Sequence, residues 1–230
     1  MNQEPFNVLI IGAGGVASYM LPALNNSFNL KGYLIDGDKL EEHNLDRQIF
    51  SPRQVGQFKA DALIKHNKVK GLTAINQYID MGWLENLGIP EDFVPDVIIT
   101  LVDNHPARRA AIEASIHYDC ALVIGANEYS TSQALYWHPI LGYNRRPDVR
   151  YPHMRTSQAG SPLSCTGDAL ESTPQLAIAN MVSAGFVNYL LWLWHGADGY
   201  DVTNTAGYEV IEYQSTFSRM ETTTLNDTTN

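Results

Sequence analysis

Cysteine is scarce in this sequence, since only Cys120 and Cys165 occur among 230 residues. Two thiols cannot build the disulfide framework of a small secreted scaffold or a four-cysteine zinc site, so we expect no structural zinc. The low count also favours a reducing cytoplasm as the location of the protein. Cys120 lies inside an apolar run, which predicts that its side chain belongs to the core.

Positive charge is scarce as well. The 15 lysines and arginines stand against 25 aspartates and glutamates, which gives a formal net charge of −10. A general nucleic-acid binder neutralises phosphates with a basic face, so this balance excludes that class of protein. A small anionic ligand can still bind where a few cations converge in one cleft.

Long hydrophobic runs are nearly absent, and the exception is the segment 176–194, which contains no charged residue. Its length approaches that of a membrane span. Polar residues interrupt it, among them Asn180, Ser183 and Asn188, and no basic flank accompanies it. We therefore expect a core or subunit-interface helix and no contact with a membrane. A secretory signal is not expected either, because residues 6–11 already have the character of a strand.

Short apolar runs alternate with longer segments of mixed polarity along the first 140 residues. The expected strands are 7–11, 30–35, 73–79, 96–102, 121–125 and 131–137. The expected helices reach from the first glycine loop to about residue 25, and then cover 52–69 and 105–117. This alternation predicts an α/β protein with a Rossmann-like, doubly wound and mostly parallel sheet that carries helices on both faces.

The pattern changes beyond residue 140, where prolines and arginines occur without periodicity. We expect the Rossmann-like core to occupy 1–140 and an irregular crossover loop to occupy 141–172. Residues 173–222 would complete the same domain with the apolar helix and an antiparallel hairpin at 207–222. The tail 223–230 is expected to be disordered.

A glycine-rich loop, GAGGVA, follows the first expected strand and opens a helix. Gly12 would allow the tight turn, Gly14 would let the backbone approach a phosphate, and Ala17 is small enough for close packing of the helix on the strand. Asp36, at the end of the second strand, stands where such folds bind a ribose. A tight turn without a ligand remains an alternative, and NAD and ATP are both compatible with these residues.

Further polar residues follow in DGDKLEEHNLDRQ, the segment 36–48. Arg47 and Lys59 would suit a triphosphate, and Asp103, at the end of the fourth strand, could hold Mg²⁺ against it. Each residue also has a simpler interpretation: the cations could be solvated, and Asp103 with Asn104 could only cap a helix. Together they fit one site.

These segments, with GQFK at 56–59 and DNHPAR at 103–108, resemble in order the motifs of the ThiF/MoeB superfamily, the adenylating domain that ubiquitin-activating enzymes share. The resemblance implies ATP and Mg²⁺ as cofactors and a homodimer formed through the apolar helix. It implies adenylation of the C-terminal carboxylate of a ubiquitin-like or sulfur-carrier protein, or of a peptide. The implied nucleotide-binding residues are Gly12, Gly14, Gly15, Ala17, Asp36, Asp38, Asn44, Arg47, Gln48, Lys59, Asp103 and Asn104.

The resemblance also suggests roles in the reaction itself. Arg47, Lys59 and Asp103 would act on the phosphates, with Asp103 as the metal ligand, and Cys165 corresponds to a cysteine that receives the activated carboxyl in some branches. The N-terminal helix whose arginine usually reaches the partner's ATP is missing from this pattern. The crossover arginines, Arg145, Arg146, Arg150 and Arg155, could replace it. Two alternatives stay open: a non-catalytic nucleotide-binding or scaffold subunit, and an NAD-dependent oxidoreductase.

Overall fold

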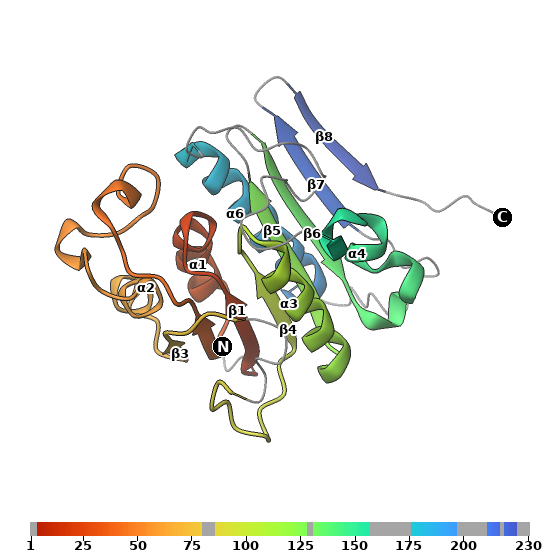
Figure 1. Cartoon of the computed structure of the whole chain (residues 1–230), viewed down its shortest axis with the longest axis horizontal. Coiled ribbons are helices and arrows are strands. Elements are labelled where there is room, and N and C mark those ends of the chain that lie inside the picture. Colours follow the sequence, from red (N-terminus) through yellow and green to blue (C-terminus); the bar gives the residue numbers. More distant parts are fainter. Residues whose placement is uncertain are drawn as a thin grey trace.

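A single mixed sheet organises the computed structural model, which describes residues 4–79, 86–127, 131–156, 176–196, 211–216 and 219–224. The strand order is β3-β2-β1-β4-β5-β6-β7-β8. Figure 1 shows the strands running across the molecule with helices on both sides. The predicted Rossmann-like α/β class is therefore confirmed.

The first five strands are parallel to one another. They are β1 (Phe6–Ile11), β2 (Leu30–Ile35), β3 (Leu72–Ile75), β4 (Val97–Thr100) and β5 (Ala121–Asn127). Their connections contain α1 (Gly15–Ser27), α2 (Lys59–Asn67) and α3 (His105–Tyr118). The order reverses between β1 and β4, which is the position where doubly wound sheets open a crevice at the carboxyl ends of the strands.

The alternating side chains of β1 show how two cores form on one strand. Val8 and Ile10 are buried with α1, α2 and α6 in one cluster, while Leu9 and Ile11 are buried with α3 in another. Successive side chains of a strand point to opposite faces, so the continuous apolar run of β1 supplies both layers.

Three antiparallel strands extend the sheet beyond β5. They are β6 (Ser132–Trp137), β7 (Ile211–Thr216) and β8 (Arg219–Thr224). A terminal hairpin was expected at 207–222, and the structure places its strands slightly later in the sequence. The expected division of the chain into 1–140, 141–172, 173–222 and 223–230 stays a prediction.

The apolar run folds into α6 (Ala177–Leu191), followed by a π-helical turn, Trp192–Gly196. The span Ala177–His195 is long and apolar enough to cross a membrane by length and composition, criteria that the core helix of a soluble protein also meets. Here α6 packs against α1, β5 and β6. On the opposite face, Ile178, Met181 and Tyr189 of α6 and Trp192 of the following turn are exposed by 40–48 %.

The helix expected at 52–69 is wrong in its first half. Pro52–Gln54 forms a short 3-10 helix with the predicted Ser51 cap, and α2 begins only at Lys59. Gly56 has a φ of +86°, outside the helical region, and donates its N–H to Leu40. These backbone contacts hold the segment between the two helices against the preceding loop, so Lys59 is the first residue of α2 and not two turns inside it.

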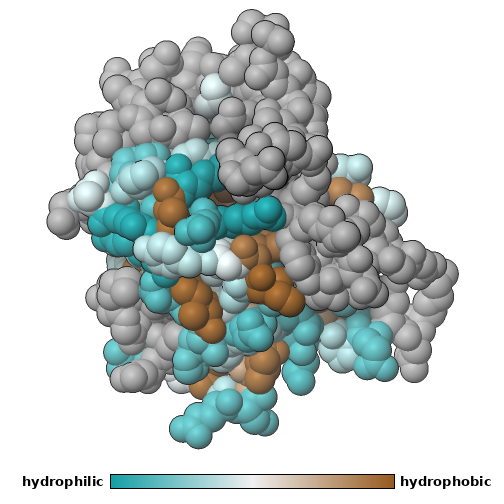
Figure 2. Space-filling view, turned by 90° about the vertical axis from the view of Figure 1, so that its right-hand side faces the viewer, coloured by the Kyte–Doolittle hydropathy of each residue, from teal (hydrophilic) through white to brown (hydrophobic). Residues whose placement is uncertain are grey.

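The described part of the crossover, up to Thr156, is more regular than expected. It contains α4 (Pro147–Arg150) and α5 (His153–Thr156), and Asp148 is buried between them. Arg146 makes two hydrogen bonds to the Asp148 carboxylate at 2.6 and 2.7 Å, and Arg155 makes a third at 3.1 Å. The side of the molecule that carries this segment is seen in Figure 2, where hydrophobic residues form small separate groups among hydrophilic ones.

We expect Asp148→Asn to lower the free energy of unfolding at pH 7 by about 2 kcal/mol, because it leaves two guanidinium groups without their shared carboxylate. Burial raises the pKa of Asp148, but Arg146 and Arg155 outweigh this effect and bring the pKa below its ordinary value. A carboxyl with a depressed folded-state pKa stabilises the fold above its unfolded pKa and loses that contribution as the pH falls through the folded value.

Urea unfolding of the wild type and of Asp148→Asn should therefore differ at pH 7 and converge as the pH falls from about 4 through the depressed pKa of Asp148. Glu113→Gln is the matched control, since Glu113 is half exposed and contacts the same Arg146 at 3.4 Å. Its effect should stay below about 0.5 kcal/mol. Equal effects of the two substitutions would contradict a structural role for the buried carboxylate.

Candidate functional site

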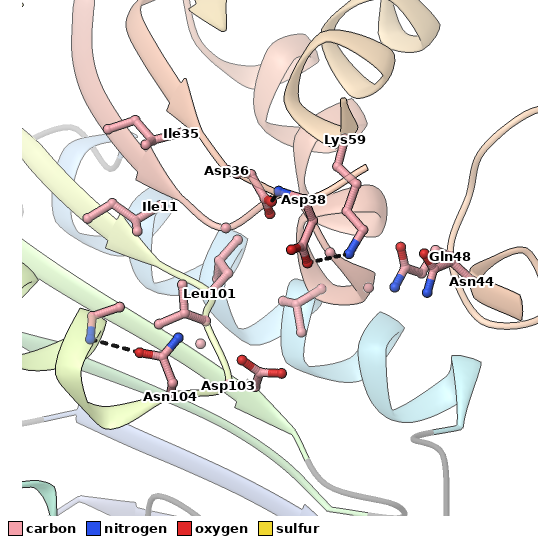
Figure 3. A pocket seen from close by; sticks show the side chains of 18 of the residues that line it. Ile11, Ile35, Asp36, Asp38, Asn44, Gln48, Lys59, Leu101, Asp103 and Asn104 are labelled. Carbon is pink, nitrogen blue, oxygen red and sulfur yellow. Dashed lines mark hydrogen bonds and ion pairs between the residues drawn. The ribbon is translucent and has the colours of Figure 1, made fainter. Parts of the chain in front are cut away.

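A cavity of about 530 Å³ opens at the carboxyl ends of β1, β2, β4 and β5. It lies where the strand order reverses, which is the usual ligand position of a doubly wound sheet. The predicted residues that line it are Gly12, Gly14, Gly15, Asp36, Asp38, Asn44, Arg47, Gln48, Lys59, Asp103 and Asn104. Residues distant in the sequence thus meet around one space, part of which Figure 3 shows.

The glycine loop forms one wall of the cavity. Gly12 has a φ of +99°, and a Cβ there would lie 3.0 Å from the backbone of Leu101, so only glycine fits without strain. Around Gly14 no atom lies within 4 Å of an added Cβ. Gly14 is also the N-cap of α1 and provides no side-chain cap. The first N–H groups of α1 are therefore available to an anionic ligand.

Asp36 connects the end of β2 to this loop. Its Oδ2 accepts the Ala13 N–H at 2.6 Å, and its Oδ1 accepts the Asp38 N–H at 2.7 Å. Burial raises the pKa of Asp36, and the two backbone hydrogen bonds offset part of that increase. A carboxylate has about four acceptor positions, so lone pairs remain for the hydroxyl groups of a ligand.

Lys59 and Asp38 form an ion pair at the cavity, with Nζ 2.8 Å from Oδ2 (Figure 3). Tyr78 donates its hydroxyl to the other oxygen of Asp38 at 2.6 Å. Burial acts to raise the pKa of Asp38, but these two hydrogen bonds dominate and lower it. Asp38 is therefore ionised at neutral pH, and it neutralises the charge of Lys59.

The loop between β2 and α2 supplies three of the predicted side chains. Asn44 uses its Oδ1 to accept the Glu41 N–H at 3.1 Å, as part of a capping box. Arg47 donates from Nη1 to the carbonyl of His43 at 3.0 Å and to Asp46 at 3.2 Å. Gln48 has a buried Oε1 without a partner among the described residues. These contacts hold the loop in shape, and the predicted phosphate contacts of its side chains stay predictions.

The two polar residues between β4 and α3, Asp103 and Asn104, have different functions in the structure. Asn104 caps α3, because its Oδ1 accepts the Ala107 N–H at 2.9 Å. Asp103 is exposed, makes no hydrogen bond or ion pair within the described residues, and points into the cavity (Figure 3). No group of three or more potential metal ligands occurs in the part of the chain that the structure describes.

Two sets of predicted residues do not line the cavity. Ala17 of α1 is fully buried in the core, which fits the close packing expected of its small side chain, and it does not line the cavity. The crossover arginines do not line the cavity, and Arg146 and Arg155 pair with Asp148 instead. Cys165 lies outside the described residues. Cys120 is buried as predicted, and burial raises the pKa of its thiol to about 12.

Two further residues of this region were not assigned to the site from the sequence. Asn180 of α6 lines the cavity and donates from Nδ2 to the carbonyl of Arg47 at 3.0 Å. Ser18 of α1 donates to the carbonyl of Gly15 at 2.7 Å and accepts the Ile49 N–H at 3.1 Å. The sequence does contain a signal for Asn180, because a polar residue in an apolar helix needs a hydrogen-bond partner when it is buried.

The model of the ThiF family matches residues 4–191, which include all elements from β1 to α6. This chain belongs to the ThiF family. The matched segment contains the whole cavity, so the site described above is part of the ThiF domain itself.

Several proteins resemble this ThiF chain. Xenopus laevis ubiquitin-like modifier-activating enzyme 5 is 28 % identical over 119 residues, which cover 46 % of this chain and 30 % of that protein. Thermus thermophilus sulfur carrier protein adenylyltransferase is 24 % identical over 191 residues, which cover 80 % of this chain and 69 % of that protein. The chain therefore spans less than a third of the length of the first of these relatives.

Solved structures of E. coli MccB share the fold. The structure with ATP and the structure with AMPCPP and MccA each give a TM-score of 0.66 at 18 % identity. The similarity covers 96 % of this chain and 63 % of each MccB chain. At this level of identity the likeness establishes the α/β architecture of the ThiF domain.

Proposed function

We propose that this protein is an ATP-dependent adenylyltransferase that activates the C-terminal carboxylate of a ubiquitin-like or sulfur-carrier protein, or of a peptide. In this reaction a carboxylate oxygen forms a bond to the α-phosphorus of ATP. The bond from that phosphorus to the bridging oxygen breaks, and pyrophosphate leaves. The observation that carries the proposal is the meeting of the glycine loop, Asp36, Arg47, Lys59 and Asp103 around one cavity.

The charges of the cavity suit the parts of ATP. Asp36 has free acceptor positions for the ribose hydroxyls, next to the Ala13 N–H that it already binds. The N-terminus of α1 faces the phosphates with uncapped N–H groups. Arg47 would add positive charge, and so would Lys59 once a phosphate replaces Asp38 as its partner. Both would stabilise the charge that develops on the departing pyrophosphate.

Asp103 fits a magnesium site, because its exposed carboxylate has no protein partner among the described residues and points into the cavity. Mg²⁺ is usually bound by one or two carboxylates together with phosphate oxygens and water. When bound, the ion would neutralise phosphate charge. Asp103 itself would hold the ion from the loop between β4 and α3, opposite the Asp38–Lys59 pair (Figure 3).

The relatives support this class of substrate. One is named a ubiquitin-like modifier-activating enzyme, another a sulfur carrier protein adenylyltransferase, and MccB was solved with ATP.

The exposed apolar face of α6 would join two copies of the chain into the homodimer that the family resemblance implies. This dimer would work in the cytoplasm. Cys165 would receive the activated carboxyl as a thioester or acyl persulfide; a covalent adduct that persists in Cys165→Ala would exclude it.

The proposal is tested by exchange of labelled pyrophosphate into ATP in the presence of ubiquitin-like proteins, sulfur-carrier proteins and peptides that have a free C-terminal carboxylate. Exchange is expected only with a cognate partner, since pyrophosphate returns to ATP only from an acyl adenylate. The same partner with an amidated C-terminus is the control and should give no exchange. Tight binding of ATP without exchange across such a panel would instead support a nucleotide-binding or scaffold subunit.

A further inference from the structure

Asn180 is fully buried near the start of α6, yet it lines the cavity. Its Nδ2 lies 3.0 Å from the carbonyl oxygen of Arg47. A carbonyl can only accept, so this contact fixes the orientation of the amide and leaves Oδ1 on the other side. That oxygen is buried without a partner among the described residues. A buried acceptor without a donor is unfavourable, and in a cavity a ligand or its bound water can satisfy it.

The amide of Asn180 lies directly against Gly15, the first residue of α1. A Cβ on Gly15 would lie 2.4 Å from Oδ1 and 2.5 Å from both Cγ and Nδ2 of Asn180. The backbone of Gly15 has no positive φ, so a turn does not require glycine here. Glycine is required at this position because the side chain of α6 occupies the space of a Cβ.

The segment around Arg47 is thus fixed from two helices. The Ser18 hydroxyl of α1 joins the Ile49 N–H to the carbonyl of Gly15. Asn180 of α6 holds the carbonyl of Arg47 and contacts Gly15 as well. These contacts set the distance between the N-terminus of α1 and the segment that carries Arg47. The two segments are the walls of the cavity that would face the phosphates.

We propose that Asn180 is a positioning residue of the nucleotide site: it fixes the Arg47 segment relative to the N-terminus of α1, so that α6 is part of the phosphate-binding site. The inference rests on the proposed function, because it takes a nucleoside triphosphate as the occupant. It goes further in assigning to α6, which packs against α1, β5 and β6, an effect on the recognition of the phosphate chain.

Calorimetric titration of Asn180→Ala with Mg-ATP and with AMP tests the assignment. We expect the affinity for Mg-ATP to fall about tenfold, because the variant loses one buried hydrogen bond and with it the position of the Arg47 segment. The affinity for AMP should fall less than about twofold. AMP lacks the β- and γ-phosphates that would meet the Arg47 segment. An equal loss for both nucleotides would indicate a merely structural residue and would overturn the proposal.

Asn188→Ala is the matched control. Asn188 is also an asparagine of α6, and its Nδ2 donates to a main-chain carbonyl, that of Met20, at 3.2 Å. It does not line the cavity. The affinity of this variant for Mg-ATP should equal that of the wild type, and a loss as large as that of Asn180→Ala would overturn the proposal.

The contact with Gly15 allows a second, independent test. Gly15→Ala should weaken Mg-ATP binding about tenfold, since the new methyl group displaces the Asn180 amide. In the double variant Gly15→Ala/Asn180→Ala the methyl group has no amide to displace, so binding should be no weaker than in either single variant. Additive losses would overturn the proposal. Failure of the wild type to bind Mg-ATP would instead refute the proposed function, and this inference with it.

Discussion

Replacing Asp103 by alanine is expected to lower partner-dependent pyrophosphate exchange by about a thousandfold, the range seen when one preorganised electrostatic group is removed from a reacting phosphate or oxyanion. Asp103 is an exposed carboxylate of the cavity, in the loop between β4 and α3, and has no partner within the described residues. Without it, no carboxylate at this position would hold Mg²⁺ against the phosphates. Asp103→Asn should show the same loss, because the charge is the property that matters.

The fold should not change with these substitutions, since Asn104 and not Asp103 caps α3. We expect the free energy of unfolding of Asp103→Ala to stay within about 0.5 kcal/mol of the wild type. Asp119→Asn is the control: it removes one negative charge at the other end of α3, at a left-handed position that asparagine tolerates. Exchange that survives in Asp103→Ala would remove this carboxylate from the reaction.

The position of the cavity could be predicted from the sequence because it depends on strand ends. Asp36 and Asp103 each follow an apolar strand, and the carboxyl ends of parallel strands meet at one edge of the sheet. Gly12 carries a similar signal, since a glycine after a buried strand indicates a tight turn. The lining of the cavity by all three residues follows from this topology.

Other features depend on contacts between distant segments, which no local pattern reveals. The helix expected at 52–69 has a good capping signal, but the backbone of Leu40 holds Gly56 out of the helix. The crossover arginines follow no periodic pattern in the sequence, and only the fold shows that Asp148 is the partner of Arg146 and Arg155. Tyr78 was expected inside a strand, whereas the strand ends at Ile75 and the tyrosine turns back to Asp38.

Two carboxylates, those of Asp36 and Asp38, lie close enough to Lys59 for its charge to act on them. Its ammonium group is already paired with Asp38, so it adds little net positive potential before a ligand binds. A phosphate chain must therefore compete with Asp38 for Lys59. Tyr78 favours the phosphate in this competition, because it binds the other oxygen of Asp38. Removal of Lys59 would therefore leave the carboxylate of Asp38 without its ion-pair partner, facing the bound phosphates.

Lys59→Met is accordingly expected to weaken the binding of Mg-ATP about a hundredfold, which corresponds to about 3 kcal/mol for a lost charge-assisted hydrogen bond and an unpaired acid. Methionine keeps most of the length of the stem, so packing at the start of α2 changes little. Lys65→Met is the matched control, because Lys65 lies on the same helix, is exposed, and changes the net charge by the same amount. Its affinity for Mg-ATP should change less than about twofold.

Asp38→Asn separates the two ways in which Lys59 can act. If Lys59 contacts the phosphates, Asp38→Asn should strengthen Mg-ATP binding severalfold, because the ammonium group no longer has a competing partner. The double variant Asp38→Asn/Lys59→Met should then bind about tenfold more weakly than the wild type, since the contact is lost but the unpaired acid is gone. Wild-type affinity in the double variant would mean that Lys59 only neutralises Asp38, and the proposed contact between Lys59 and the phosphates would be wrong.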